Sequence, residues 1–381
     1  MLSPRLSQNK WELAHYFGTI YGVEEAQAMI EVLNDWAPST NQKAPEFEQR
    51  FAEYVGAQNA VATNSWAGAA HLVAIVINIE PGDEIIVPAL TFSASANIFA
   101  REGAKIVFAE SDPHTFNLDP NKLEEKISSH TKAIIIVHMC GQPCDMDIIL
   151  EIAQRHHLLI IQDASHAPGA EYHGKKMGEM GDFAIYSFQQ SKNISTLGEG
   201  GMVVMNNSEW GDKMRCIRSH GGQEYLGISC RMTDVQGAVG LIQLERLETY
   251  NSIRRKLAYR LNKILASIEG ITTPYEIPNV KHVYHLYNVT VDESKIAMTR
   301  DAFIQKLWES YKIKAVTKYF PTLNCLPVYK KFGHAKGECP IAERTASKIV
   351  TLPISPRFTE IDLEELVQGI SGVISHGIPS N

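Results

Sequence analysis

Seven short apolar runs, each bounded by turn residues, recur through the first 205 residues of the sequence, and segments of helical length separate most of them. Most runs are rich in valine and isoleucine, as expected for strands that helices cover on both faces. This alternation predicts an α/β protein with one large, mainly parallel, seven-stranded sheet. The predicted strands are residues 59–63, 84–88, 105–109, 131–138, 158–162, 183–188 and 201–205. The predicted helices between them are residues 45–55, 66–78 and 146–156.

The pattern changes in the second half of the chain. Residues 234–268 are helical in periodicity and highly charged, which predicts long connecting helices that lead into a second domain. We therefore expect a large domain over residues 1–250 and a smaller α+β C-terminal domain over residues 251–381. In the smaller domain, alternation predicts a strand within residues 284–292, and a helix that begins with threonine is predicted over residues 299–311.

Length and composition limit the class of protein. The chain has 381 residues, of which 44% are hydrophobic, enough for a large core. Its net charge is −7 and its charges are interspersed, so we expect no nucleic-acid partner. No apolar run has membrane-spanning length and the N-terminal residues lack the order of a secretory signal, so we expect a cytoplasmic protein with no membrane partner.

The six cysteines are scattered along the chain, which indicates reduced thiols and not a disulfide framework. Cys140 and Cys144 are spaced like a pair of metal ligands, but no second pair lies at ligand spacing. We therefore expect no metal site.

The stretch YSFQQSKNISTLGEGGMVV, residues 186–204, places Lys192 in a loop after a predicted strand. Taken alone, Lys192 is most simply a solvated surface charge. However, Ser187 lies near the end of the strand, and glycines at 198, 200 and 201 permit close backbone approach and positive φ. A lysine that such a loop partly desolvates has a lowered pKa and becomes a nucleophile toward carbonyl compounds.

Asp163 follows another predicted strand, at the edge where ligands gather in open parallel sheets. A carboxylate there needs a positive partner, such as an arginine, a metal or a protonated ring nitrogen. A structural role, as a helix cap or in an arginine pair, is an equal alternative. His166 lies three residues further along, and a lone histidine is more often a hydrogen-bonded core residue than a ligand.

Together these residues fit the needs of pyridoxal phosphate, which are a lysine for its aldehyde, an acid for its ring nitrogen and an anion site for its phosphate. Lys192 and Asp163 supply the first two. The stretch TNSWAGAA, residues 63–70, joins a strand to a helix whose free N–H groups and dipole favour an anion. Phe92 lies beyond a strand end, where it is either a platform for the ring or an ordinary core residue.

The whole pattern resembles the DegT/DnrJ/StrS aminotransferase family, from about residue 45 to about residue 370. The resemblance rests on the motifs GDEIIVPALTFSASAN, HMCGQPCDMD, IIQDASHAPGAEYHGKKMGEMGD, SFQQSKNISTLGEGGMVV, RSHGG, CRMTDVQGAVGLIQLERLE and TLPISP, in this order. It implies the aspartate-aminotransferase-like fold type I, usually as a homodimer with the active site at the subunit interface. It also implies transfer of an amino group from glutamate or glutamine to a keto-sugar, often nucleotide-linked, or to a cyclitol ketone.

The resemblance implies a role for each candidate residue. Lys192 would form a Schiff base with the cofactor and move the proton at the reacting carbon. Asp163 would pair with the pyridinium nitrogen, and His166 would lie near the ring oxygen. Phe92 would stack on the ring.

The phosphate contacts depart from the family pattern. Ser187 and the backbone amides of Ala67 and Gly68 would bind phosphate, but the usual Asn-Ser-Gly-Thr is NSWA here, so Trp66 replaces a glycine and Ala67 a threonine. Ser229, in the segment that would reach the partner subunit's cofactor, stands where asparagine is usual. These departures predict altered phosphate contacts.

Two other functions stay open within this resemblance. The family's sugar dehydratases, which use pyridoxamine phosphate, replace the lysine with histidine, so Lys192 argues against them. The altered phosphate contacts leave room for a non-catalytic, pyridoxal phosphate-binding regulatory protein. Gln189 and Gln190 resemble loops of members that act on inososes, which is a hint toward a cyclitol or free-sugar acceptor.

Overall fold

A seven-stranded sheet forms the centre of the computed structural model, which describes residues 9–35, 38–39 and 41–375. Its strand order is β1-β9-β8-β5-β4-β2-β3. β9 is antiparallel to both neighbours, and the other pairs are parallel, so the mainly parallel sheet is confirmed. All seven predicted strands are present within one residue of their expected ends: β1 Asn59–Thr63, β2 Glu84–Pro88, β3 Lys105–Ala109, β4 Thr131–Val137, β5 Leu159–Asp163, β8 Phe183–Ser187 and β9 Gly201–Met205.

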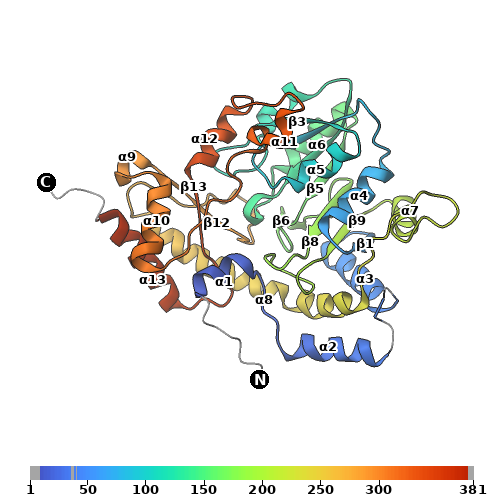
Figure 1. The fold of residues 1–381 in the computed structure, drawn as a ribbon, viewed down its shortest axis with the longest axis horizontal. Coiled ribbons are helices and arrows are strands. Elements are labelled where there is room, and N and C mark those ends of the chain that lie inside the picture. Colours follow the sequence, from blue (N-terminus) through green and yellow to red (C-terminus); the bar gives the residue numbers. More distant parts are fainter. Residues whose placement is uncertain (1–8, 36–37, 40, 376–381) are drawn as a thin grey trace.

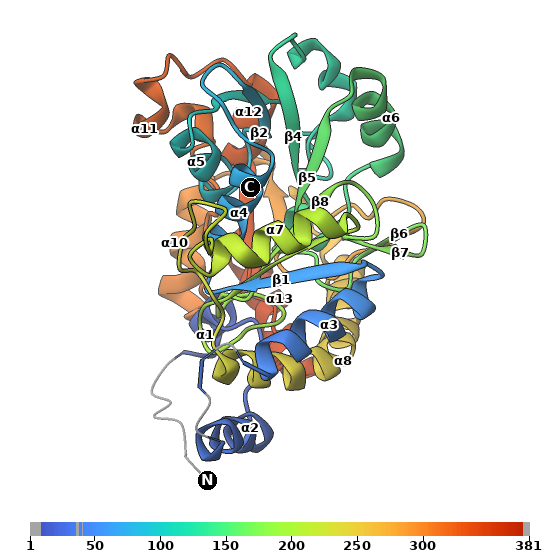
Figure 2. The ribbon, with the colours of Figure 1, turned by 90° about the vertical axis from the view of Figure 1, so that its right-hand side faces the viewer.

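Helices cover both faces of this sheet, which is why its strands are almost continuously apolar (Figures 1 and 2). One face packs against α4 (Trp66–Val76), α5 (Ala94–Arg101) and α7 (Ser208–Arg218). The other face packs against α3 (Lys43–Val55), α6 (Met146–His156) and the first half of α8 (Asp234–Leu265). The three helices predicted in this part of the chain are confirmed as α3, α4 and α6.

α8 is one uninterrupted helix of 32 residues, where several connecting helices were expected. No proline breaks it, and its two glycines lie where α3 packs closely against it. A Cβ at Gly237 would lie 2.6 Å from the backbone nitrogen of Ala44, and one at Gly240 would lie 2.7 Å from the ring of Phe47. These glycines allow α3 to pack closely against α8. They do not mark a turn, and the helix continues through them. Figure 1 shows α8 running from beneath the sheet to the C-terminal part of the molecule.

The C-terminal part has a core of its own around the second half of α8. It contains an antiparallel sheet of order β10-β12-β13 (Ile271–Thr272, Tyr287–Val291, Ile349–Leu352), with α10 (Arg300–Tyr311) and α13 (Glu360–Ser375). Trp11 of α1 (Lys10–Tyr16) also packs into this core. The division of the chain at residue 250 stays a prediction.

The remaining elements are short or peripheral. α2 (Val23–Asn34) packs on α8, and α12 (Pro340–Lys348) returns to the large sheet, where Ala342 and Ala346 join its core. The others are β6 Glu171–Tyr172, β7 Lys175–Lys176, β11 Val280–Lys281, α9 Glu293–Ile296, α11 Pro327–Lys330 and the 3-10 turns Pro120–Lys122, Glu124–Lys126, Met139–Gly141 and Leu323–Cys325.

Two expectations from the sequence concern a membrane span and a secretory signal. Within the described residues, every helix is too short or too polar to cross a membrane. Residues 1–8, which contribute to the expectation that no secretory signal is present, lie outside the described residues.

Candidate active site

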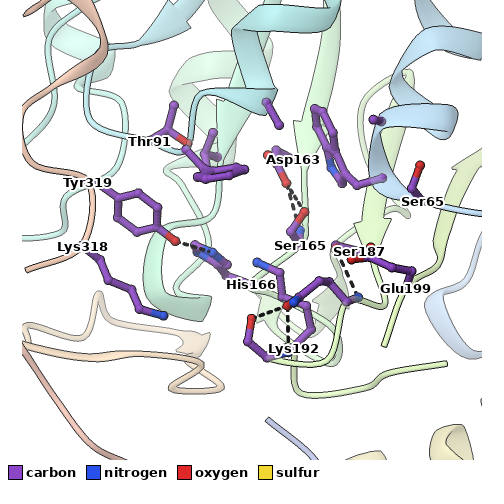
Figure 3. A pocket seen from close by; sticks show the side chains of 17 residues that line it. Ser65, Thr91, Asp163, Ser165, His166, Ser187, Lys192, Glu199, Lys318 and Tyr319 are labelled. Carbon is purple, nitrogen blue, oxygen red and sulfur yellow. Dashed lines mark hydrogen bonds between the residues drawn. The ribbon is translucent and has the colours of Figure 1, made fainter. Parts of the chain in front are cut away.

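A cavity of about 590 Å³ lies at the edge of the sheet where β4, β5 and β8 end (Figure 3). The N-terminus of α4, the loop after β2, the loop that carries Lys192 and a segment after α10 complete its walls. Of the eight residues to which the sequence assigned a role with the cofactor, six line this cavity: Ala67, Phe92, Asp163, His166, Ser187 and Lys192. The two that do not line it are Gly68 and Ser229.

Lys192 is half-buried in the cavity wall, in a loop with several backbone anchors. Its N–H donates to the carbonyl of Gln189 at 2.9 Å, and the N–H of Gly18 donates to the carbonyl of Gln190 at 2.9 Å. Gly18 must be a glycine, because a Cβ there would lie 2.1 Å from the carbonyl oxygen of Lys192. Loss of water around Lys192 lowers its pKa to about 8; nearby Lys318 also lowers it, and Asp163 opposes the shift. Lys192 is thus half-buried in a cavity and not a fully solvated surface charge, and a pKa of about 8 leaves a substantial fraction of its amine neutral near pH 8.

Asp163 is the last residue of β5 and is only 6% exposed. The hydroxyl of Ser95 donates to its Oδ2 at 2.8 Å, and the N–H and hydroxyl of Ser165 donate to its Oδ1. Within the described chain no basic side chain pairs with it, which removes the arginine alternative. A buried carboxylate with neutral donors only can accept a cationic ligand atom, such as a protonated ring nitrogen.

His166 is buried beside Asp163 and makes two contacts with its ring. Its Nε2 lies 3.0 Å from the hydroxyl of Tyr319, and the ring stacks on His285 with centroids 4.4 Å apart. Burial, together with the charges of Lys192 and Lys318, holds its pKa well below the usual range, so the ring is neutral. Its buried Nδ1 has no hydrogen-bond partner among the described residues. This nitrogen is free to pair with a polar atom of a bound molecule.

The opposite end of the cavity has the features of an anion site. Ser187 ends β8, and Ala67 lies in the first turn of α4, where the helix dipole favours negative charge. The N–H of Gly68 donates to the hydroxyl of Ser65 at 3.1 Å, so Ser65 caps the N-terminus of α4. A Cβ at Gly68 would lie 3.0 Å from Oδ1 of Asn64 and 3.2 Å from Cβ of Cys230, which explains the small residue.

Phe92 and Ser229 are both exposed, but in different places. Phe92 is 62% exposed at the cavity wall, so it is not the core residue that the sequence left possible. Ser229 pairs with Ser219 through an isolated backbone bridge, and its hydroxyl accepts from Arg231 at 3.3 Å. The structure of one chain does not bring Ser229 to its own cavity.

Several cavity residues were not predicted from the sequence. Thr91, Ser165 and Glu199 lie beside predicted residues in the same motifs. Lys318 and Tyr319 come from the irregular segment after α10, where no motif marks them. Tertiary folding alone places these two at the end of β5.

These residues fit pyridoxal phosphate: a lysine of lowered pKa, a buried carboxylate without a cationic partner, an unsatisfied imidazole nitrogen and a helix N-terminus share one cavity. Comparison with known proteins agrees. Residues 20–371 match the DegT/DnrJ/EryC1/StrS aminotransferase family. GDP-perosamine synthase from Caulobacter vibrioides is 39% identical over 347 residues, which cover 89% of this chain and 92% of that protein.

Solved structures of similar fold also carry this chemistry. S. venezuelae DesV in complex with a ketimine intermediate has a TM-score of 0.88 and 31% identity, over 94% of this chain and 95% of DesV. The PLP form of Spr1654 from Streptococcus pneumoniae has a TM-score of 0.88 and 26% identity, over 94% and 98% of the two chains. The fold is thus fold type I, and the protein is a sugar aminotransferase of amino-sugar biosynthesis with pyridoxal phosphate as its cofactor. The chain belongs to the DegT/DnrJ/EryC1/StrS aminotransferase family.

Proposed function

We propose that Lys192, Asp163, His166 and Ser187 hold pyridoxal phosphate in this cavity and carry out amino transfer with it. When bound, the cofactor supplies an electron sink for the carbon that gains or loses the amino group. Asp163 keeps the ring nitrogen protonated, His166 donates to or accepts from the ring oxygen, and Ser187 binds phosphate. The observation that carries the proposal is the lowered pKa of Lys192 opposite the buried Asp163.

Lys192 has two tasks in this proposal. Its neutral amine would hold the cofactor through the aldehyde carbon, with loss of water, and, when the donor's amine has displaced it, would move a proton at the reacting carbon. Phe92 supplies the platform against which the ring stacks, and the amide of Ala67 adds to the phosphate site. The absence of a side chain at Gly68 lets Asn64 and Cys230 pack close to it. Its N–H donates to the hydroxyl of Ser65.

For substrates, we propose glutamate or glutamine as the amino donor and a keto-sugar, nucleotide-linked or free, as the acceptor. The relative from Caulobacter vibrioides is named for a GDP-linked sugar, which supports a nucleotide-linked acceptor. Gln189, which lines the cavity, supports a cyclitol ketone or free sugar as the alternative acceptor. A cytoplasmic location is part of the same proposal and rests on six free thiols.

We also propose a homodimer with the active site at the subunit interface. Phe92 leaves one wall of the cavity open to solvent, and the loop before Cys230 carries Leu226, which is 97% exposed. Tyr225, next to Leu226, is also exposed, and apolar side chains grouped on a surface mark contacts with another chain. In the dimer, the loop with Leu226 and Ser229 closes the cavity of the partner subunit.

One experiment tests the aminotransferase assignment directly. Glutamate or glutamine is added to purified protein loaded with pyridoxal phosphate, and the visible absorption band of the cofactor is followed together with 2-oxo acid formation. We expect the band to bleach and one equivalent of 2-oxo acid to form. A loaded protein whose band neither donor bleaches would contradict the proposal and favour the regulatory alternative.

A further inference from the structure

The cavity contains a second lysine, Lys318, for which the proposed cofactor chemistry has no use. It lies in the irregular segment between α10 and α11, and its side chain is half-buried in the cavity wall. Among the described residues, no hydrogen bond or ion pair reaches its ammonium group. Lys318 therefore differs from Lys281, whose ammonium group pairs with Glu171 and Glu248.

An ammonium group in this position is unfavourable without a counter-ion. Desolvation lowers the pKa of Lys318. The thiol of Cys140, which interacts electrostatically with Lys318, does not compensate the charge, because burial raises the pKa of this thiol to about 12 and keeps it protonated. A charge that the protein leaves half-buried and unpaired is stabilised when a ligand brings the opposite charge.

The position of Lys318 shows which ligand part it would meet. In Figure 3, Lys318 and Tyr319 lie on one side of the cavity, whereas Ser65, Ser187 and Glu199 lie on the other, with Lys192 between them. The proposed phosphate site is at Ser187, so the cofactor's phosphate is remote from Lys318. Tyr319 fixes this segment, because its hydroxyl lies 3.0 Å from Nε2 of His166. The ammonium group of Lys318 is therefore on the side of the cavity that the proposed phosphate site leaves free, where a substrate has room to bind.

We propose that Lys318 binds the α-carboxylate of the amino donor, an inference that rests on the function proposed above. In an amino acid, this carboxylate is bonded directly to the carbon that carries the amino group. An amino acid reacting beside Lys192 therefore has its carboxylate within reach of the same wall. The phosphates of a nucleotide-linked acceptor are also negatively charged, but several bonds separate them from the carbonyl carbon that reacts. Lys318 is a binding residue that selects amino donors with a free α-carboxylate.

The test compares Lys318→Met with the wild type in the donor half-reaction. Cofactor-loaded protein is titrated with glutamate, with glutamine and with isoglutamine, which carries an amide in place of the α-carboxylate. The visible absorption of the cofactor is recorded. For glutamate and glutamine, we expect the half-saturating concentration to rise about 10- to 100-fold in the variant, as for loss of a charged hydrogen-bond partner. Isoglutamine should bind wild type and variant equally weakly.

The matched control is Lys312→Met, because Lys312 is an exposed lysine of the same segment that does not line the cavity. It should titrate like the wild type. Lys318→Gln provides a second variant if Lys318→Met does not fold.

Other outcomes would overturn the inference. Three results do so: equal titrations in wild type and variant, a loss with glutamate but not glutamine, or an equal loss with isoglutamine. A loss confined to reaction with a nucleotide-linked keto-sugar would assign Lys318 to the acceptor's phosphate instead and so overturn it as well. If neither glutamate nor glutamine bleaches the cofactor band of the wild type, both the proposed function and the inference on Lys318 fail.

Discussion

At the scale of single residues, the cavity is defined by charged side chains that form no ion pair within the described chain. Asp163 is buried against two serines, and Lys318 has no carboxylate beside it. Lys192 lies between them with a pKa lowered to about 8. Lys192 and Asp163 could be predicted because both follow buried strands, whereas Lys318 could not, because no local pattern marks a residue that only tertiary folding brings to the site.

Lys192→Ala should abolish both the visible absorption band of the bound cofactor and amino transfer. The amine is the only part of Lys192 that the proposal uses, so the thermal unfolding midpoint should stay close to that of the wild type. Spectroscopy, product assay and thermal unfolding of the same sample check this. Full activity in the variant would remove Lys192 from the mechanism.

Asp163→Asn should reduce turnover by about 30-fold or more. The amide cannot hold a proton on the ring nitrogen, and loss of one partner from a buried charge pair costs about 2–5 kcal/mol. The variant should still bind the cofactor, which its absorption spectrum shows. A turnover number near that of the wild type would mean that Asp163 is not the ring partner.

The lowered pKa of Lys192 also predicts how cofactor uptake depends on pH. Only the neutral amine attacks an aldehyde, so uptake of pyridoxal phosphate by stripped protein should accelerate about tenfold per pH unit below about 8 and level off above it. Stopped-flow absorbance at several pH values measures this. A rate that keeps rising up to pH 10 would indicate an unshifted lysine.

At the scale of elements, the strands were predictable and many connections were not. A strand buried on both faces must be apolar along its length, and the runs at β2 and β4 therefore stand out in the sequence. β6 and β7 have two residues each and carry no such pattern. α2 was not predicted either, because it packs only at the margin, with Val23 and Leu33 exposed.

Asp234 shows how two elements are joined by one side chain. It lies in the first turn of α8, is 1% exposed, and accepts from the N–H groups of Asn41, Gln42 and Ala44 at 2.7–3.0 Å. Asp234→Ala should lower the free energy of unfolding by about 2–5 kcal/mol, because it leaves buried donors unsatisfied. Denaturant unfolding measures the change, and Asp212→Ala, at an exposed position of α7, should change it by less than about 0.5 kcal/mol.

At the scale of the whole molecule, the cavity is a meeting point of distant segments. The sheet supplies Asp163 and Ser187, and the C-terminal part supplies Lys318 and Tyr319. The sequence indicated two parts from the change of pattern near α8. It gave no sign that α12 returns to the large sheet, since its apolar residues are mostly small alanines.

The proposed dimer predicts a solution mass of twice 42.5 kDa, measured by analytical ultracentrifugation. Leu226→Asp should shift the distribution toward the single chain, because it places a charge in an apolar contact. Activity should fall in parallel if the loop closes the partner's cavity. A wild type that sediments as a single chain at micromolar concentration would refute the dimer.

Gly18 follows α1 and contacts both the loop that carries Lys192 and the long helix α8. Its N–H holds the carbonyl of Gln190, and Nη2 of Arg254 donates to its own carbonyl at 2.6 Å. Just before it, α1 is held to α13 by Lys10, which pairs with Asp362 and Glu365. For protein engineering, this means that the first helix helps to hold the loop of Lys192 in place and should be kept. Trimming the chain past Gly18 would remove no cavity side chain, yet it would loosen the loop on which the reactivity of Lys192 depends.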